Sequence, residues 1–350
     1  MTGDRGSGTL EYVGVAVVVA AVIVAILASG IAPALAGRAT SAVCTVLRQS
    51  CVGPGLAATP YERAVSGRYV ALGDSFSSGE GAGSYRPDSD RDENSTADRV
   101  GQFLDDYLIP GDHTDTKPVD FCHRSDNAYG PIIAGQNTFP GGSTFNACSG
   151  AVAVDLVADN QGNAGEGPQL EAITKDTTLV TFSIGGNDVG FADILQDCVM
   201  DGSTCEDKNE AQFQQRLVAL EPVLVARYAE ARSRAKEGAR VIVVGYPHLF
   251  PDDPSNSYRN LLFADDQAWM NQKGTELNTM IASAVREAGV EFVDPTAAFA
   301  GHGIGSDDPW FNDITLGGPG WAPVDPGSFH PNAAGQKALA DLVQHQLEHP

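Results

Sequence analysis

The chain is poor in basic residues, with 22 Lys and Arg against 45 Asp and Glu among 350 residues, and its formal net charge is -23. A strongly negative protein repels phosphate groups, which argues against nucleic acid and anionic lipid headgroups as partners. A neutral small molecule is a better ligand for such a surface.

Metal-binding motifs are also missing. The sequence contains no C-x-x-C pair and no H-E-x-x-H motif, the spacings that would indicate zinc. Asp88, Asp90 and Asp92 alternate like the first half of a calcium loop, but Glu93 stands where that loop needs glycine and Arg99 where it needs glutamate. We therefore expect a solvated acidic loop, no metal site and no cofactor.

The chain lacks G-x-S-x-G, the serine turn of α/β-hydrolases. It has instead Gly73-Asp74-Ser75, directly after the apolar run Tyr69 to Leu72. A serine at the junction of a buried strand and a glycine-rich turn is held from below and open above, as a nucleophile must be. Gly-Asp-Ser is also an ordinary turn sequence, so its meaning depends on the rest of the chain.

Three further motifs end apolar runs or precede a helix. One run ends at Gly150, a second leads into Gly185-Gly186-Asn187-Asp188, and Ser328-Phe329-His330 comes just before the last helical segment. In parallel α/β sheets, reactive groups collect at the carboxyl ends of strands. Ser75, Gly150, Asn187 and His330 are therefore predicted to meet in one site.

These four motifs resemble the four blocks of the SGNH (GDSL) hydrolase superfamily, and more closely its secreted actinobacterial lipase and esterase branch. The resemblance covers most of residues 67–350. It implies a three-layer α/β/α domain with a flavodoxin-like parallel sheet of about five strands. It also implies a serine carboxylester hydrolase that acts on small-molecule, lipid or acylated-glycan esters, and we expect its catalytic domain to be monomeric.

The residue types suit that chemistry. A serine hydroxyl needs a base within hydrogen-bond reach, and the histidine pKa fits this task near neutral pH, so Ser75 is the predicted nucleophile and His330 its base. The expected oxyanion donors are the backbone N–H groups of Ser75 and Gly150 and the side-chain amide of Asn187, each worth about 3 kcal/mol. Glycine lets the substrate oxygen approach the backbone, and an Asp at position 187 could only accept hydrogen bonds.

The group that orients His330 departs from the family's common pattern. That pattern has an Asp three residues before the histidine, where this chain has Gly327. Some members of the resembling branch use a backbone carbonyl there, so the resemblance implies that the Gly327 carbonyl accepts from the histidine ring. Asp325 is the alternative, but it would have to fold back across Pro326.

The six cysteines predict an oxidising compartment. Pairing between sequence neighbours would give Cys44–Cys51, Cys122–Cys148 and Cys198–Cys205. The latter two pairs resemble those of the secreted lipase branch. We therefore expect an extracytoplasmic protein, either secreted or anchored to a membrane.

An apolar segment near the N-terminus carries no charge from Val13 to Gly37, and it is long enough to span a bilayer of ~30 Å. As a signal peptide it would be cleaved after Ala36. Alternatively, Gly6 and Glu11-Tyr12 resemble the processing site of Flp/Tad-type pilin-like proteins, and cleavage after Gly6 would retain the helix as an anchor. We favour the anchor, because a signal peptide prefers positive charge before its apolar run.

The predicted organisation is a leader or anchor at 1–36, a linker with a cysteine pair at 37–66, and the hydrolase domain at 67–350. Strands are expected at 68–72, 144–147, 179–184, 240–244 and 291–293, and helices at 211–237, 265–288 and 332–346. An insertion at 81–118 would shape the acyl site. The alternative function is a pilin-like surface or assembly protein whose hydrolase-like domain only binds.

Overall fold

The computed structural model describes residues 58–90, 120–160, 162–163, 165–201, 205–254, 258, 262–316 and 324–350. Thr59–Pro350 forms one compact unit. The predicted apolar segment at 13–37, the Cys44–Cys51 pair and most of the 81–118 insertion lie outside the described residues. In the part of the chain that is described, no helix is long and apolar enough to cross a bilayer.

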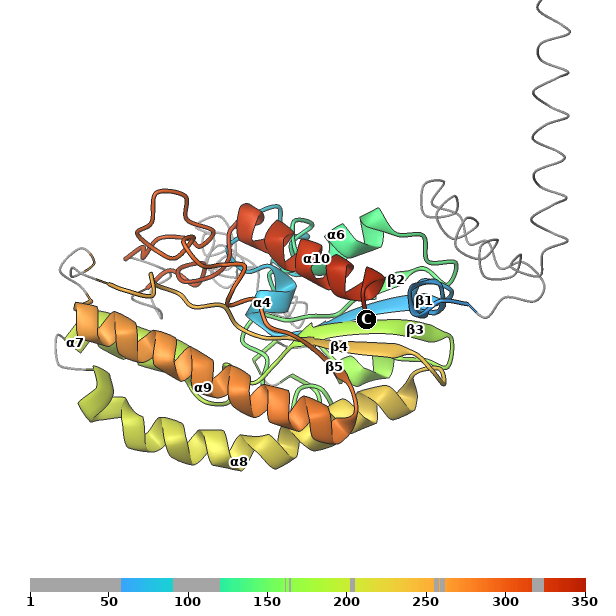
Figure 1. The fold of residues 1–350 in the computed structure, drawn as a ribbon, viewed down its shortest axis with the longest axis horizontal. Helices are drawn as coiled ribbons and strands as arrows, with labels where there is room; N and C mark the ends of the chain where they lie inside the picture. The colour runs from blue at the N-terminus through green and yellow to red at the C-terminus, as the bar shows by residue number, and fades with distance from the viewer. Residues whose placement is uncertain are drawn as a thin grey trace, which may run out of the picture. The chain divides into compact units, whose positions relative to one another are not determined.

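The centre of the unit is the expected parallel five-stranded sheet (Figure 1). Its strands run in the order β2-β1-β3-β4-β5, and every neighbouring pair is parallel. The strands are β1 (Arg68–Gly73), β2 (Ser143–Phe145), β3 (Thr177–Ser183), β4 (Arg240–Val244) and β5 (Glu291–Val293). All residues of β3 and β4 are buried, as expected for strands covered on both faces.

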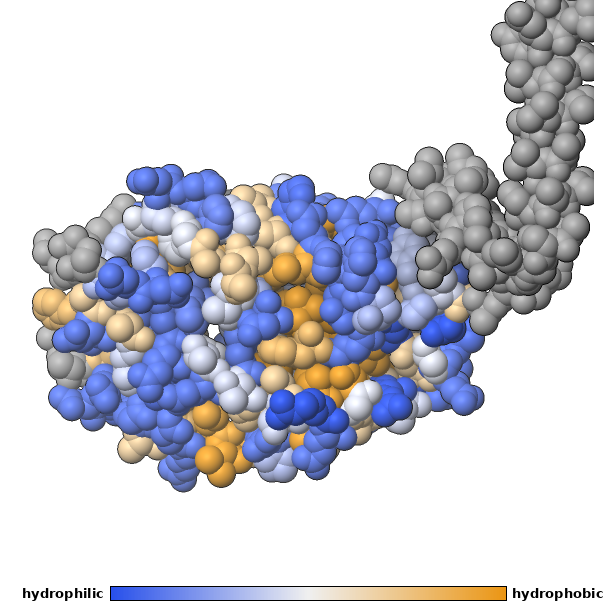
Figure 2. Space-filling view, in the orientation of Figure 1, coloured by the Kyte–Doolittle hydropathy of each residue, from blue (hydrophilic) through white to orange (hydrophobic). Residues whose placement is uncertain are grey.

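Helices cover both faces of this sheet, which gives the three layers that the sequence predicts (Figure 1). One layer contains α6 (Tyr129–Gln136) and α10 (Ala333–Glu348), and the other contains α7 (Phe191–Asp201), α8 (Cys205–Arg234) and α9 (Ala264–Ala288). The buried positions of α8 recur every three or four residues and form one apolar stripe: Phe213, Leu217, Leu220, Leu224, Tyr228 and Ala231. Figure 2 shows apolar residues gathered where edge strand β5 reaches the surface between α9 and α10.

Two boundaries differ from the prediction by more than three residues. The first is that α8 begins at Cys205, six residues before the expected start at Ala211. The second concerns a short helix inside the predicted linker, α3 (Pro60–Ala64), which begins with a Thr59 and Glu62 capping box and buries Ala64 in the core. The compact unit therefore starts at Thr59 instead of Gly67.

Two of the predicted disulfides are present. Cys122–Cys148 joins the loop before α6 to the loop after β2, next to Gly150. Cys198–Cys205 joins α7 to the first residue of α8. Each closes a loop and so restricts the unfolded chain.

Candidate active site

Ser75 lies at the carboxyl end of β1, where the strand turns into the short helix α4 (Ser75–Ser78). Gly73 makes this turn with φ of 118°, and a Cβ there would collide with the Ser183 carbonyl of β3. The Gln169 side chain, in the 3-10 helix η1 (Gln169–Ala172), accepts from the Gly73 N–H at 2.7 Å and donates to its carbonyl at 3.0 Å. These contacts hold Ser75 rigidly at the end of the central strands.

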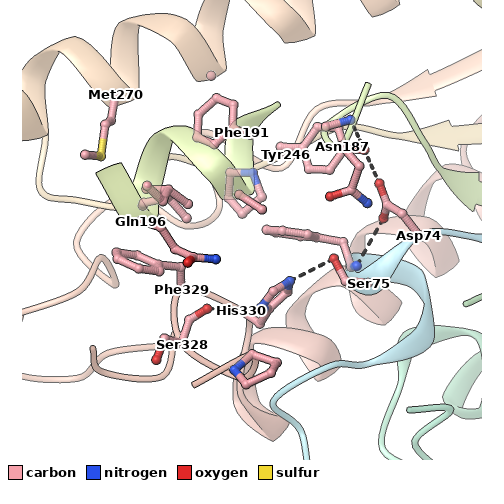
Figure 3. Close-up of a pocket in the computed structure, with 18 of the residues that line it drawn as sticks. Asp74, Ser75, Asn187, Phe191, Gln196, Tyr246, Met270, Ser328, Phe329 and His330 are labelled. Atoms are coloured by element: carbon pink, nitrogen blue, oxygen red, sulfur yellow. Dashed lines mark hydrogen bonds between the residues drawn. The ribbon is translucent and has the colours of Figure 1, made fainter. Parts of the chain in front are cut away.

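His330 approaches Ser75 from the loop before α10 (Figure 3). Its Nε2 lies 2.8 Å from the Ser75 Oγ, although the two residues are 255 positions apart. Asn332 starts α10 by accepting from the N–H groups of Ala334 and Gly335, and this cap fixes where the His330 loop ends. The structure thus brings together the predicted nucleophile and base.

The residue that orients His330 is neither of the two expected ones. The ring Nδ1 lies 3.0 Å from the Ser328 carbonyl. The Gly327 carbonyl instead accepts from the Asn312 amide at 3.1 Å, and the Asp325 carboxylate accepts from the Gly327 N–H at 2.9 Å. The reason is a left-handed turn at Phe329, with φ of 65°, which directs the carbonyl two residues before the histidine toward the ring.

The environment of His330 keeps its imidazole neutral near pH 7. Burial lowers the pKa of His330 below its usual 6.5, although the Glu80 charge and the hydrogen bond to the Ser328 carbonyl act in the opposite direction. A neutral ring with its Nδ1 proton on a carbonyl leaves Nε2 free to accept a proton. That tautomer is the one a general base opposite Ser75 requires.

The three expected oxyanion donors line the same cavity as the Ser75 hydroxyl. Among the described residues, neither the Ser75 N–H nor the Gly150 N–H has a protein acceptor. The Asn187 amide donates one hydrogen bond to the Ala151 carbonyl at 2.9 Å, and its NH₂ group carries a second hydrogen. Gly150 has φ of 78°, a conformation that favours glycine.

A buried polar network lies beneath Ser75, and its central member, Tyr246, was not among the predicted site residues. The Tyr246 hydroxyl donates to the Asp74 carboxylate and accepts from the Gly186 N–H at 3.0 Å. Asp74 also accepts from the Phe76 N–H at 3.1 Å, which braces the turn. Burial raises the pKa of Asp74 to about 7. The signal for Tyr246 was its place two residues after the end of the apolar strand β4.

The cavity in front of Ser75 has a volume of about 270 Å³ and a largely apolar wall (Figure 3). Its apolar side chains come from α7, α9 and the loops after β4 and before α10: Phe191, Leu195, Leu249, Met270, Leu277, Val324 and Phe329. An apolar chain is the ligand that such a wall stabilises. The arrangement can therefore hold an aliphatic acyl group with its carbonyl next to Ser75.

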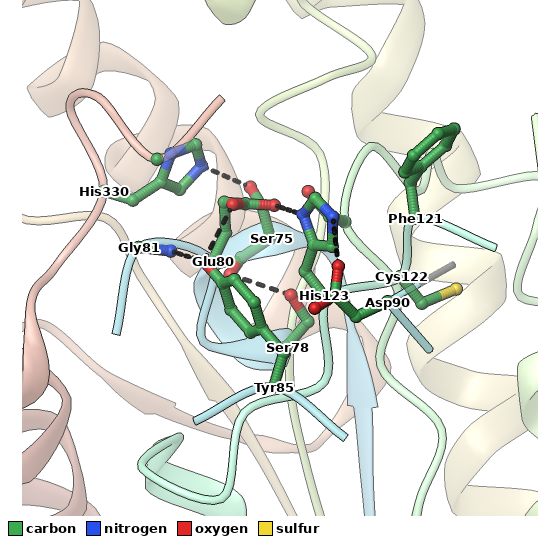
Figure 4. A network of polar contacts seen from close by, with 12 residues as sticks. Ser75, Ser78, Glu80, Gly81, Tyr85, Asp90, Phe121, Cys122, His123 and His330 are labelled. Carbon is green, nitrogen blue, oxygen red and sulfur yellow. Dashed lines mark hydrogen bonds and ion pairs between the residues drawn. The ribbon is translucent and has the colours of Figure 1, made fainter. Parts of the chain in front are cut away.

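A second polar cluster, built around Glu80 and His123, adjoins Ser75 on the other side (Figure 4). Neither residue was among the predicted site residues. In this cluster the His123 Nδ1 lies 2.6 Å from the buried Glu80 carboxylate. His248, by contrast, pairs with Asp252, and His302 stacks on Trp310. Nothing in the local sequence distinguishes His123 from these two.

Within the described ranges, one cluster has the atom types of a metal site: Asp120, Cys122 and Glu166. Cys122 is bound to Cys148 in a disulfide, so it offers no thiolate. Glu166 forms a two-point ion pair with Arg124, at 2.7 and 2.9 Å. These residues tie the loops beside Gly150 together and do not fit a metal ion.

Comparison with known proteins agrees with this geometry. The model of the GDSL-like lipase/acylhydrolase family matches residues 71–338. The chain is 32% identical over 274 residues to a lipase of Streptomyces rimosus, which covers 77% of this chain and 82% of the relative. Lipase 1 of Streptomyces coelicolor is 30% identical over 268 residues, with the same coverage of 77% and 82%.

Two solved structures resemble the fold at 30% sequence identity. An extracellular lipase from Streptomyces rimosus gives a TM-score of 0.61, covering 80% of this chain and 99% of that one. A phospholipase A1 from Streptomyces albidoflavus gives a TM-score of 0.58, covering 80% of this chain and 98% of that one.

Proposed function

Because the chain belongs to the GDSL-like lipase/acylhydrolase family and is a carboxylic ester hydrolase, we propose that Ser75 and His330 carry out its reaction through an acyl-enzyme. The observation that carries the proposal is the 2.8 Å contact between Ser75 Oγ and His330 Nε2, with the opposite ring nitrogen on the Ser328 carbonyl. A serine, a base and a group that orients the base are the parts that nucleophilic catalysis needs.

In the first half of the reaction, the Ser75 oxygen attacks the ester carbonyl carbon and its proton moves to His330 Nε2. The carbonyl oxygen becomes an oxyanion, which the N–H groups of Ser75 and Gly150 and the Asn187 amide stabilise. The carbon–oxygen bond to the alcohol then breaks, and His330 returns the proton to the departing oxygen. An acyl group remains on Ser75.

Water completes the cycle. The water oxygen attacks the acyl carbon while His330 takes a proton from the water. The same three oxyanion donors stabilise the second oxyanion. The bond to Ser75 breaks, the serine oxygen recovers the proton from His330, and the acid leaves. No step of this cycle requires a metal or an organic cofactor.

We propose an electrically neutral lipid ester as the substrate. The apolar side chains of the cavity support an aliphatic acyl group, and relatives named lipase and phospholipase A1 support a lipid alcohol. The net charge of -23 disfavours an anionic headgroup.

We further propose that the hydrolase works outside the cytoplasm. Two disulfides and the similarity to an extracellular lipase support this location. If the segment at 13–37 is retained, it would hold the enzyme at a membrane surface, whereas cleavage after Ala36 would release it. The mass of the mature N-terminal peptide distinguishes the two.

A p-nitrophenyl ester series run on the full chain tests the proposed chemistry. We expect turnover that rises from acetate to medium-length acyl groups and that Ser75→Ala abolishes. Ser66→Ala is the matched control, because the Ser66 hydroxyl is exposed and bonds only a carbonyl at the end of α3. If no acyl length gave Ser75-dependent turnover, the pilin-like binding module would be the better interpretation.

A further inference from the structure

The Glu80–His123 pair is a buried ion pair next to the proposed catalytic residues (Figure 4). Glu80 is 2% exposed, and its carboxylate contacts His123 Nδ1 at 2.6 Å and the Tyr85 hydroxyl at 3.1 Å. The Tyr85 ring stacks on the His123 ring with centroids 4.9 Å apart, and Asp90 lies 3.7 Å from His123 Nε2. These contacts hold the Glu80 and His123 side chains in fixed positions.

The environment of the pair favours its charged form. Burial would raise the pKa of Glu80, but the hydrogen bond and the charge of His123 outweigh it and leave this pKa below its usual value. Burial would likewise lower the pKa of His123, and the Glu80 carboxylate outweighs it and raises this pKa. Each partner therefore favours the charged form of the other.

The loop that carries Glu80 is clamped to the nucleophile and to the His330 loop. The Glu80 N–H donates to the Ser75 carbonyl at 3.1 Å. The Asn312 amide donates to the Gly81 carbonyl at 2.8 Å and to the Gly327 carbonyl at 3.1 Å, bridging the two loops. A Cβ on Gly81 would lie 3.1 Å from the His330 Cβ. The distance between Glu80 and His330 is thus set by direct backbone packing.

His330 Nδ1 lies on the Ser328 carbonyl, and no carboxylate of the described residues hydrogen-bonds to it. When Ser75 attacks, the ring gains a full positive charge, which a carbonyl dipole compensates less well than an anion does. The charged or titratable side chains around this part of the described site include Glu80 and His123, with Tyr85 and Asp90 against them, and Asp325 and Asp74. Asp325 is engaged with the Gly327 N–H, and Asp74 lies below Ser75 with Tyr246.

We propose that Glu80 is a positioning residue for the reaction, a buried carboxylate on the neighbouring loop that stabilises the His330 imidazolium in place of the missing triad Asp. His123 lies on the far side of the carboxylate and holds it ionised, so the negative end of the pair faces His330 (Figure 4). This inference rests on the proposed Ser75–His330 chemistry.

Glu80→Gln tests it, because the amide keeps the size of the side chain and removes its charge. We expect kcat to fall about tenfold, a part of the roughly 10²- to 10⁴-fold that general acid–base catalysis contributes. We also expect the acid limb of the kcat/KM profile to move about half a pH unit or more downward, because an anion that favours the imidazolium has been lost. KM should change little, since Glu80 does not line the cavity in the described structure.

Glu291→Gln is the matched control. Glu291 is also a carboxylate in an ion pair, with Arg240, but it lies on β5 away from Ser75, so its loss should leave the acid limb in place. If Glu80→Gln lowered kcat without moving the acid limb, Glu80 would be a structural brace and the inference would be wrong.

A second variant covers the case in which Glu80→Gln fails to fold because His123 loses its anion. The double variant Glu80→Gln/His123→Gln replaces the ion pair with an amide pair, and the same downward shift is expected. An unshifted limb in the folded double variant overturns the inference. Residual turnover by Ser75→Ala would instead overturn the proposed function, so the two failures are distinguishable.

Discussion

Asn187→Ala is the sharpest test of the proposed oxyanion site, because this side chain has two separable roles. One amide hydrogen of Asn187 bonds the Ala151 carbonyl at 2.9 Å, and the other is the proposed oxyanion donor. The first role contributes to folding, about 1 kcal/mol for an ordinary hydrogen bond. The second contributes only while the oxyanion exists, so its loss affects kcat and not KM.

The expected loss in kcat is on the order of a hundredfold to a thousandfold, or about 3 kcal/mol, for removal of one preorganised donor. Asn187→Asp should lose at least as much, because a carboxylate only accepts hydrogen bonds and adds a negative charge beside the oxyanion. Both variants should remain folded, with a modest decrease in melting temperature.

Steady-state kinetics on a medium-chain p-nitrophenyl ester, together with thermal unfolding, measure the two roles separately. Asn137→Ala is the control: its amide also bonds a backbone carbonyl, that of Ile133 at 2.9 Å, but in α6. We expect the control to lose stability and keep its kcat. If folded Asn187→Ala kept kcat within about threefold of the unmodified enzyme, far below the loss of a donor, the oxyanion assignment would be refuted.

Two further predictions follow from the environment of His330. Asp325→Asn should change kcat/KM by no more than about threefold, because an amide oxygen can also accept the Gly327 N–H; a hundredfold loss would restore Asp325 as the orienting group. In the unmodified enzyme, kcat/KM should fall as the pH drops through the pKa of His330, since only the neutral ring accepts the Ser75 proton. Burial places that midpoint below 6.5, so a midpoint above this value on an uncharged ester would contradict the described environment.

The strands could be predicted from the sequence because their signal is local. β1, β3 and β4 are short apolar runs that end at Gly73, Ser183 and Val244, and a run of this length between turn residues indicates a strand buried on both faces. The helix α8 was harder at its start, because Cys205 to Glu210 is polar and its helical state depends on packing and on the disulfide.

The residues of the proposed site could also be predicted from the sequence. Ser75, Gly150 and Asn187 each follow a predicted strand, and the carboxyl ends of parallel strands meet at one edge. His330 was identified by its motif before the last helix. The structure brings all four to one cavity.

The sequence by itself therefore determined the sheet and the four motifs, and the family resemblance favoured a backbone carbonyl over Asp325 behind His330. Only the tertiary structure decided that this carbonyl belongs to Ser328, because the left-handed turn at Phe329 sets its direction. It alone also paired Glu80 with His123, 43 positions apart. Strands and turns are determined by residues that are neighbours in the sequence. Contacts between distant loops depend instead on how tertiary packing directs each loop.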